Sequence, residues 1–519
     1  MSNSSARMVS LALLVAGCAF GISCARDLAR PGNASPQPAD AGNAKGKIVA
    51  THVMGCMAVG NGRVPKGESH LAVGPTRWNG IMAGHVPEYM SNYGQPLAAA
   101  KQDISMMKAA GVNAIALMVS GHLIRSQFSA MNHAYFQAAM EDGEMKIYPD
   151  VWGDTSTPAG VALMADELAL IKEKYESVWL RRDGRLVVSV QGLADKNTET
   201  ADKLFAKIGG REKVYLILYG QGKAKNADAF TGWFHESYGV NLGNLGNAMA
   251  VGKESGKPFW QPVMPSFTQS RHPSNGVIPN VREQLGMCWF RESWQAAIKG
   301  DAPAVFIETW NDLTEDSAVM PDSNHGYAYF ELNKYYAAWF KNGKRPDIEK
   351  EQVLLFHHPQ IVEGVKLPAG VKPMEGFPVA FGNTFDQRHG TPPTDYVGVV
   401  TMLKSPAKVS VMLGETVLGE REFPAGVNSW LLYQPRNQND PRKLYPYDPE
   451  KVYPKEEEDL VITKLDKPFS DAEVFVSVSR GKDRIGFFRS HRPIVSAAGR
   501  GDMTTVGDVF TLENTPRAR

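Results

Sequence analysis

The stretch AVFIETWNDLTEDS, residues 304–317, begins as an apolar run typical of a β-strand and continues into a loop that holds four carboxylates. Side chains point alternately to the two sides of a strand. Phe306, Glu308 and Trp310 therefore share one side, and Asp312 continues it. The pattern predicts a strand whose carboxyl end presents acidic and aromatic side chains together.

The stretch KIYPDVWGD, residues 146–154, repeats this arrangement earlier in the chain. Tyr148, Asp150, Trp152 and Asp154 share one side of the predicted strand. An acid that a strand carries into the interior must find a polar partner, because an unpaired buried charge is costly. Two strands that direct Asp and Trp toward their carboxyl ends are typical of a parallel sheet whose strands end around a common site.

Between residues 48 and 343, short apolar runs alternate with longer amphipathic ones, which predicts an α/β fold. The expected strands are Ile48–Met54, Ala114–Ser120, Lys146–Trp152, Leu186–Gly192, Val214–Gly220, Phe230–Glu236, Pro258–Ser266 and Ala304–Asn311. Helical patterns lie at Leu97–Ala110, Ala159–Tyr175, Asn197–Ile208 and Val281–Lys299. This order predicts a (β/α)8 TIM barrel over residues 48–343. The alternative, a doubly wound sheet, would need a Gly-rich phosphate turn after its first strand, and HVMGCMAVG (52–60) is a poor match to one.

The pattern changes after a charged, Pro-containing linker, KRPDIEKEQ (344–352). Residues 353–490 contain alternating runs separated by Gly and Pro turns, without clear helical periodicity. This spacing predicts a C-terminal antiparallel β-sandwich domain. We expect residues 491–519 to form a loosely held C-terminal tail.

Residues 1–24 have the pattern of an export signal, since Arg7 precedes an apolar run that is too short to span a membrane as a mature helix. The residues around Cys18 resemble a bacterial lipobox, in which this Cys would carry a lipid anchor to a membrane. A plain secretory signal is the alternative. Residues 25–47, rich in Ala, Pro, Gly and Asn, are expected to form a flexible linker. We therefore expect an exported protein, either a lipoprotein of the bacterial periplasm or cell surface, or a secreted protein.

The charge balance and the motifs that are absent exclude several classes. The 519-residue chain has a formal net charge of +1, and no basic stretch gathers the charge that a phosphate backbone requires, so nucleic acid is not an expected partner. The sequence has no GxSxG, GxxxxGK[ST] or HExxH motif. We expect a monomer, and we leave open whether Cys56 and Cys288 form a disulfide or stay buried thiols.

The carboxyl ends of the predicted strands bring carboxylates, amides and aromatic rings to one mouth. Carboxylates and amides hydrogen-bond hydroxyl groups, and a carboxyl pair supplies the acid and base for cleavage of a glycosidic bond. We therefore expect a glycan substrate. The expected substrate-binding residues are His52, Tyr148, Trp152, Asp154, Gln191, His235, Glu236, Glu308, Trp310 and Asn311. Other polar side chains at these strand ends are Ser120, His122, Tyr219, Gln261 and Ser266, whereas Asp316 is expected to be a solvated loop acid.

The segment VFIETWNDLTEDSAVMP resembles the ETWNDYGES block of glycoside hydrolase family 71, the endo-α-1,3-glucanases or mutanases. Further blocks resemble the family in the same order: IVATHVMG, QDISMMKAAGVNAIALMVS, KIYPDVWGD, RLVVSVQG, KPFWQPVMPSF and CWFRESWQAAI. The resemblance extends over residues 49–490, including the sandwich. It implies hydrolysis of α-1,3-glucosidic bonds in a glucan, with inversion at the anomeric carbon and without a cofactor or metal.

The resemblance also implies which acids act. The family's catalytic acids have the spacing D-x-x-E in this block, which corresponds to Asp312 and Glu315 here, although it does not assign the acid and the base. Asp150, which matches the Asp of the third-strand block, is the second choice for a direct catalytic role.

The chain departs from the family pattern next to these acids. Leu313 and Thr314 replace a Tyr-Gly pair, and residues 316–318 replace Ser-His-Tyr. These departures leave alternatives open: hydrolysis of another polysaccharide, or a non-catalytic glycan-binding surface protein on a degenerate barrel. A metal-dependent hydrolase that uses His52, Asp150 and His235 is a third reading.

Overall fold

The structure is a computed structural model of the whole chain. The residues it describes are 46–55, 95–125, 129–153, 155–191, 193, 198–219, 226–232, 256–267, 285–312, 316–322, 324–361, 395–434, 459–496 and 504–512. The predicted export signal, Cys18 and nearly all of the predicted linker lie outside these residues. Within the described ranges, no helix is both long and apolar enough to cross a membrane.

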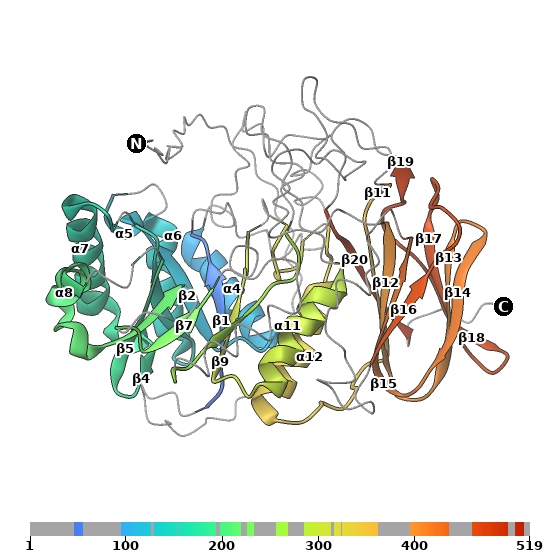
Figure 1. Ribbon diagram of the computed structural model, residues 1–519, viewed down its shortest axis with the longest axis horizontal. Helices are drawn as coiled ribbons and strands as arrows, with labels where there is room; N and C mark the ends of the chain where they lie inside the picture. Colours follow the sequence, from blue (N-terminus) through green and yellow to red (C-terminus); the bar gives the residue numbers. More distant parts are fainter. Residues whose placement is uncertain are drawn as a thin grey trace.

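Eight parallel strands form the barrel that the sequence predicted (Figure 1). They are β1 (Ile48–Val53), β2 (Ala114–Val119), β3 (Lys146–Val151), β5 (Arg185–Val190), β6 (Val214–Tyr219), β7 (Ala229–Thr231), β8 (Trp260–Val263) and β9 (Ala304–Ile307). Their order around the sheet is β7-β6-β5-β3-β2-β1-β9-β8, and β4 (Arg181–Arg182) forms a hairpin with β5. The ends of this order meet where the backbone N–H of Phe230 donates to the carbonyl of Pro258 at 3.0 Å. The barrel is therefore nearly closed.

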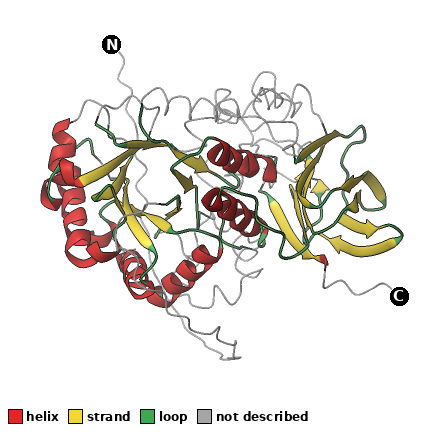
Figure 2. Cartoon of the chain, turned by 90° about the horizontal axis from the view of Figure 1, so that it is seen from below, coloured by secondary structure: helices red, strands yellow, loops and turns green. Residues whose placement is uncertain are grey.

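Helices cover the outside of the barrel (Figure 2). They are α4 (Pro96–Ala109), α5 (His122–Arg125), α6 (Ser129–Asp142), α7 (Pro158–Tyr175), α8 (Thr198–Phe205), α11 (Met287–Lys299) and α12 (Ala328–Asn342), with 3-10 turns at Glu176–Val178, Ala206–Ile208 and Arg211–Lys213. Helix α7 illustrates the local signals. Thr157 caps its first turn by accepting a hydrogen bond from the Gly160 amide at 3.2 Å, and Pro158 occupies the first helical position, where its missing N–H costs nothing.

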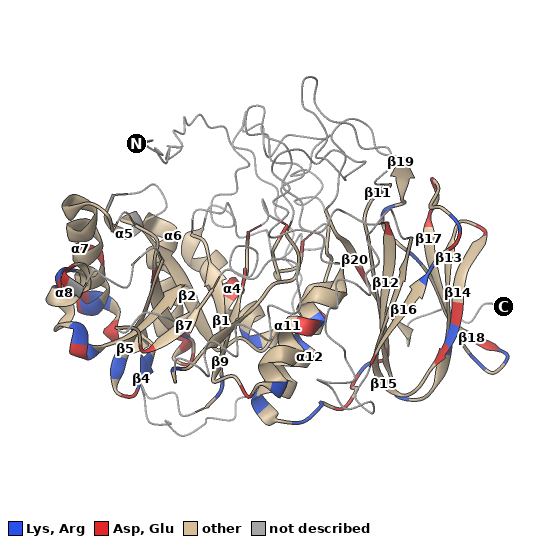
Figure 3. Ribbon diagram, viewed as in Figure 1, with Lys and Arg blue, Asp and Glu red and all other residues tan. Residues whose placement is uncertain are grey.

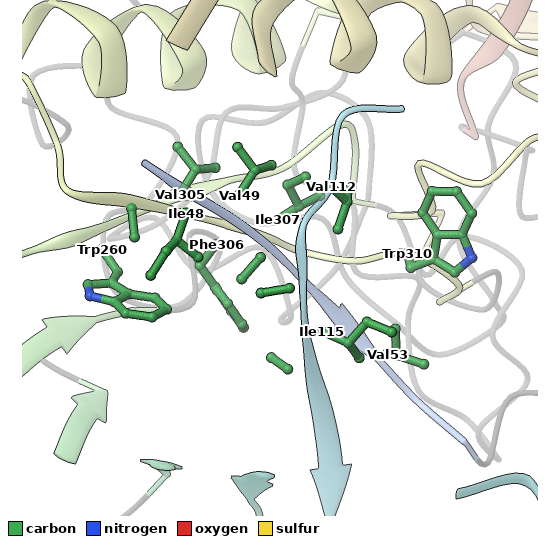
Figure 4. Close-up of a cluster of buried hydrophobic side chains, with 14 of the residues drawn as sticks. Ile48, Val49, Val53, Val112, Ile115, Trp260, Val305, Phe306, Ile307 and Trp310 are labelled. Atoms are coloured by element: carbon green, nitrogen blue, oxygen red, sulfur yellow. The ribbon is translucent and has the colours of Figure 1, made fainter. Parts of the chain in front are cut away.

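The barrel core lies between the strands and these helices. Val49 of β1 stands in register with Val305 of β9, and Ile48 and Ile307 pack in the same cluster (Figure 4). All four side chains are almost fully buried. Burying an aliphatic side chain of this size stabilises a fold by roughly 1.5–3 kcal/mol, so the apolar runs that marked the strands also supply most of the driving force.

Two sheets form the C-terminal sandwich. The inner sheet has the order β16-β15-β12-β10-β20, and the outer sheet has the order β14-β13-β17-β18. Their strands are β10 (Gln352–His357), β12 (Tyr396–Leu403), β13 (Ala407–Leu413), β14 (Thr416–Phe423), β15 (Gly426–Tyr433), β16 (Leu460–Lys464), β17 (Val474–Arg480), β18 (Asp483–Arg489) and β20 (Val506–Thr511), with a short parallel pair of β11 (Gln360–Ile361) and β19 (Val495–Ser496). Within the two sheets the pairing is antiparallel except between β15 and β16, which run parallel.

The sandwich extends beyond residue 490, where we expected a loose tail. Strand β20 pairs with β10 over its whole length, from Thr511 opposite Gln352 to Val506 opposite His357. The segment expected as a tail therefore supplies an edge strand. Its sequence, VGDVFT, is short and broken by Gly and Asp, so its local pattern does not identify a strand without the partner that it pairs with.

The inner sheet buries both of its faces. Along β10, Val353 and Leu355 belong to the core between the two sheets, whereas Leu354 and Phe356 belong to the core that includes the barrel helices. Helices α11 and α12 lie between the barrel and the sandwich (Figure 1). The predicted barrel and sandwich are therefore joined through a common apolar core.

Charged residues of both signs are interspersed over the described helices and strands (Figure 3). Several form exposed pairs of opposite sign, such as Lys203 with Glu199 on α8 and Lys408 with Glu420 across β13 and β14. Exposed pairs of this kind stabilise a protein by at most about 1 kcal/mol each. The charge pattern therefore serves solubility more than the fold.

Candidate active site

A buried carboxylate, Asp150, lies at the carboxyl end of β3 and is the centre of a polar cluster. Its Oδ1 accepts a hydrogen bond from Ser189 Oγ at 2.5 Å. Its Oδ2 accepts from Trp152 Nε1 at 2.6 Å and from the Tyr219 hydroxyl at 3.0 Å. His52 Nε2 lies 3.2 Å from the same oxygen. Four side chains from β1, β5, β6 and the end of β3 thus converge on one carboxylate inside the barrel.

Aromatic rings surround this cluster. The His52 ring stacks on Trp152, with centroids 5.4 Å apart and planes 23° apart. Phe306 of β9 lies 6.0 Å from His52 and 6.0 Å from Tyr219. Tyr148, two positions before Asp150, meets Trp260 of β8 edge-on at 5.7 Å. Both predicted alternations, along β3 and along the start of β9, therefore direct these side chains into the barrel.

The cluster has a negative electrostatic character. Burial raises the pKa of the Tyr219 phenol well above its usual range, and the charges of Asp150 and Glu308 add to that effect. Burial, with Asp150 beside it, raises the pKa of Tyr148 in the same way. Both phenols therefore keep their protons at ordinary pH, so Tyr219 acts as a hydrogen-bond donor to the Asp150 carboxylate.

The alternation along β9 predicted that Trp310 faces the barrel mouth, but the structure places it elsewhere. Its side chain is fully buried, and its indole hydrogen-bonds the Asp103 carboxyl of α4, on the helix side of the sheet. In Figure 4 its ring lies well apart from Phe306 and Trp260. The reason is that the regular strand ends at Ile307, so the two-residue alternation no longer fixes directions beyond it. Trp310 therefore joins α4 to the end of β9.

The side chain of Asn311 hydrogen-bonds the backbone of the chain after β1 rather than facing the barrel mouth. Its Oδ1 accepts from the Met54 amide at 3.0 Å, and its Nδ2 donates to the Met54 carbonyl at 3.1 Å. The Trp310 amide also donates to the carbonyl of His52 at 2.8 Å. These bonds tie the chain after β9 to the end of β1, which carries His52.

Asp312 lies beyond the carboxyl end of β9 and is almost fully buried. Its amide donates to Thr309 Oγ1 at 2.7 Å, and its carbonyl accepts from the Ser317 amide at 3.1 Å. The Thr309 amide donates back to the Ser317 carbonyl at 2.8 Å, and the Val319 amide donates to the Thr309 carbonyl at 3.0 Å. The described residues before and after positions 313–315 are therefore paired by backbone hydrogen bonds. We call residues 312–316 the acidic loop.

Other predicted site residues have different positions. Glu308 follows β9 directly, is buried, and donates its amide to the Val263 carbonyl at 2.8 Å. Gln191 is half-buried, and its amide extends the pairing of β5 with β3 by donating to the Val151 carbonyl at 3.0 Å. The predicted residues outside the described part of the chain are Asp154, His235, Glu236 and Glu315.

Sequence reasoning missed two groups that shape the site. Ser189 is the one hydroxyl residue in the apolar strand RLVVSV. A hydroxyl in such a strand indicates a buried hydrogen-bond partner, which is the Asp150 carboxylate. Glu167 of α7 is buried, and its oxygens accept from the amides of Gly121 and Leu123 at 2.6 and 2.7 Å. Burial raises the pKa of Glu167, and these two amide hydrogen bonds counteract part of the rise. Glu167 thereby fixes the loop at the carboxyl end of β2.

Asp316 is buried and ion-paired, so the expectation of a solvated loop acid is wrong. Its side chain is 1% exposed, and its Oδ1 lies 3.3 Å from His325 Nε2. His325 has no counterpart in the strand pattern, because it lies beyond β9 in the turn before α12. The sequence gives no local sign that these two residues meet.

The fold and the site together define a (β/α)8-barrel protein with a buried acidic site at the carboxyl ends of its strands. The model of glycosyl hydrolase family 71 matches residues 80–434, and the chain belongs to this family.

The chain is also similar to individual proteins. A mutanase of Penicillium rubens is 28% identical over 189 residues, which are 33% of this chain and 38% of the relative. The chain thus spans little more than a third of the length of that curated relative. Among solved structures, a GH99 endo-alpha-mannosidase from Bacteroides thetaiotaomicron is 16% identical, with 57% of this chain and 98% of that chain covered and a TM-score of 0.43. A putative beta-galactosidase from Bacteroides fragilis is 8% identical, with coverage of 88% and 55% and a TM-score of 0.38.

Proposed function

We propose that the protein is a glycoside hydrolase that cleaves α-1,3-glucosidic bonds of a glucan. The observation that supports the proposal most directly is the buried Asp150 carboxylate with its four polar partners, at the barrel end where the acidic loop also lies. Membership in family 71 and the similarity to a mutanase support the choice of bond and substrate.

The proposed mechanism is inverting. An inverting glycosidase uses one carboxylic acid to protonate the leaving oxygen and one carboxylate to activate a water molecule, with the two carboxyl groups roughly 6.5–9.5 Å apart. Asp312 and Glu315, three positions apart in the acidic loop, fill these two roles in the proposal. Which of them is the acid stays open.

Asp150 has a different role in this proposal. Donors from Ser189, Trp152 and Tyr219 already bind its oxygens, so it is poorly placed to exchange a proton with a substrate. A fixed carboxylate instead stabilises positive charge as it develops, which suits the oxocarbenium-like transition state of glycoside cleavage. We therefore assign electrostatic stabilisation, rather than proton transfer, to Asp150.

The test uses insoluble α-1,3-glucan and the chain without residues 1–24. Released reducing sugar is measured for the wild type, for Asp312→Asn and for Glu315→Gln. Asp301→Asn is the matched control, because Asp301 lies just before β9, at the opposite end of the strand, with its side chain 90% exposed. We expect release by the wild type and the control and a loss of at least about a thousandfold in both loop variants, the scale on which loss of an essential catalytic group acts.

Other outcomes select among the alternatives. Release from a different polysaccharide in a panel would keep the hydrolase and reject the α-1,3 linkage, with Leu313 and Thr314 as the first residues to examine. Binding of glucan in a pull-down without release from any polysaccharide would favour a glycan-binding surface protein. Activity abolished by a chelator and restored by a metal would favour the metal-dependent hydrolase. NMR of the first product anomer decides between inversion and retention.

We also propose that the protein is exported and lipid-anchored through Cys18. The support is the apolar run after Arg7 and the lipobox-like residues before this Cys. Expression of the full chain in a bacterium with a radiolabelled fatty acid tests it. Label on the wild type but not on Cys18→Ser is the expected result, whereas a soluble, unlabelled exported protein would indicate a plain secretory signal.

A further inference from the structure

We propose that Asp316, held by His325 and by strand β20, is a positioning residue that fixes the acidic loop for catalysis, so that the C-terminal sandwich is part of the catalytic unit. This inference rests on the proposed glycoside hydrolase function. It goes beyond that function because it assigns a role to a residue and to a domain that the acid–base pair alone does not require.

Three parts of the chain converge on Asp316. Its Oδ2 accepts a hydrogen bond from the Thr505 amide at 2.8 Å, just before β20. Its Oδ1 lies 3.3 Å from His325 Nε2, in the turn before α12. Ser266, after β8, donates its hydroxyl to the Asp316 carbonyl and also lies 3.4 Å from Oδ2. The residue that directly follows Glu315 is thus held through both its carboxylate and its backbone.

A second carboxylate holds His325 from the other side. Asp322 Oδ2 lies 2.9 Å from His325 Nδ1, and Asp322 Oδ1 accepts from the amides of Asn324 and His325 at 2.6 and 3.0 Å. Burial alone would lower the pKa of His325, but the charges of Asp322 and Asp316 outweigh it and raise the pKa to about 10. The imidazole therefore stays protonated at ordinary pH and bridges two carboxylates.

Strand β20 is packed closely against this turn. The Gly507 amide donates to the Asn324 carbonyl at 2.7 Å. A Cβ atom at position 507 would come within 2.7 Å of the His325 carbonyl, a backbone atom that cannot move aside. The absence of a side chain at Gly507 therefore lets β20 approach closely enough for the Thr505 amide to reach Asp316.

The backbone of Asp316 gives an independent sign that it is held in place. Its φ angle is 59°, in the left-handed region that non-glycine residues seldom adopt. Such a conformation costs about 1–2 kcal/mol and persists when surrounding contacts determine it. The neighbouring Ser317 amide donates to the Asp312 carbonyl at 3.1 Å, so the anchor at Asp316 lies next to the contact that holds the backbone of Asp312.

The test compares Asp316→Ala, Asp316→Asn and a matched control, Asp508→Ala. Asp508 is also a buried carboxylate on β20, and it pairs with His491 at 2.8 Å and accepts from Ser490 at 2.7 Å, but it touches no residue of the acidic loop among the contacts of the described chain. For each protein we would measure steady-state kinetics on the polysaccharide that the wild type cleaves. We would also measure thermal unfolding and the hydrogen exchange of peptides that cover residues 309–320.

We expect Asp316→Ala to lower kcat about a hundredfold and to change KM less than about threefold, since a misplacement of about 1 Å in a catalytic group has this effect. Asp316→Asn, which keeps an acceptor for the Thr505 amide, should retain about ten times more activity than the alanine variant. Asp508→Ala should lower the unfolding temperature comparably but leave kcat within about twofold of the wild type. Faster exchange of residues 309–320 is expected only in the Asp316 variants.

The inference is overturned if folded Asp316→Ala keeps the wild-type kcat, or if Asp508→Ala reproduces both its loss of kcat and its faster exchange. A wild type without activity on any polysaccharide would refute the proposed function instead. In that case hydrogen exchange alone decides whether Asp316 anchors the loop, because this readout needs no substrate.

Discussion

Replacing Asp103 with Asn should remove a large part of the pH dependence of the free energy of unfolding. Asp103 lies in α4 and is fully buried between the helices and the end of β9. The Tyr135 hydroxyl and the Trp310 indole hydrogen-bond its carboxyl. Burial raises the pKa of Asp103 from 3.8 to about 7, because these two hydrogen bonds compensate only part of the loss of hydration.

The sign and size of the effect follow from this shift. Between the unfolded pKa of 3.8 and the folded pKa of about 7, the folded protein holds a proton that the unfolded chain has released. The stabilisation is therefore complete below the unfolded pKa and is lost as the pH rises through the folded pKa. One pKa unit corresponds to about 1.4 kcal/mol, so the full loss is about 4 kcal/mol, and about 3 kcal/mol of it falls between pH 5 and pH 8.

The assay is urea denaturation of the wild type and Asp103→Asn at several pH values between 5 and 8. Other titrating groups, such as His325 and Glu167, are common to both proteins, so their contributions cancel in the difference. The Asn variant is less stable at pH 5 because it places an uncharged amide where a protonated carboxyl fits. Between pH 5 and pH 8, the free energy of unfolding of the wild type should fall by about 3 kcal/mol relative to that of Asp103→Asn, because only the wild type has a buried carboxyl that ionises.

Parallel stability curves for the two proteins, within about 0.5 kcal/mol over this pH range, would contradict a raised pKa of Asp103 in the folded protein. Such a result would mean that the Asp103 carboxylate is as well solvated in the fold as in the unfolded chain. A Tyr135→Phe variant gives a further check, because loss of a donor to the charged form should raise the pKa of Asp103 and steepen the pH dependence.

Three further predictions concern the site and the sandwich. Trp152→Phe should lower kcat about tenfold or more, because Asp150 loses one charge-assisted hydrogen bond. Trp179→Phe is the control and should leave kcat unchanged, because the Trp179 indole donates to the Val187 carbonyl at 2.7 Å and, among the described residues, makes no contact with Asp150. Asn311→Ala should lower the free energy of unfolding by roughly 2–3 kcal/mol, measured in urea, because both backbone groups of Met54 lose their partner. Burial lowers the pKa of His357 from 6.5 to about 4, so about 3 kcal/mol of stability present above pH 6.5 should be lost as the pH falls to 4, and His357→Asn should lack this loss in acid unfolding curves.

The barrel was predictable because each strand carries its own signal. The strands predicted at Ala114–Ser120 and Val214–Gly220 match β2 and β6 to within one residue. Such runs are decided locally, by the need to bury both faces of a parallel sheet. The alternation in KIYPDV likewise predicted that Tyr148 and Asp150 point into the barrel, since the regular strand extends past both.

The remaining features depend on contacts between distant segments. The alternation failed for Trp310 because the chain leaves the strand after Ile307, and no local signal marks that point. Asp316 was misjudged because one partner, Thr505, is far along the chain and no local pattern marks the other, His325. Strand β20 was missed for the same reason, since its pairing with β10 determines it more than its own sequence does. Long-range pairing of this kind cannot be deduced from residue patterns alone.

The bond between the Thr505 amide and Asp316 also orders events during synthesis. All eight barrel strands lie before residue 308, so during synthesis or export they become available to pair before β20 does. The acidic loop gains its hydrogen bond from Thr505 only after a strand that lies almost two hundred residues later in the chain has been synthesised. A chain that is interrupted before residue 505 would contain every barrel strand but would lack the hydrogen bond from Thr505 to Asp316. Pairing of the barrel strands and fixing of the acidic loop are therefore separate steps of folding.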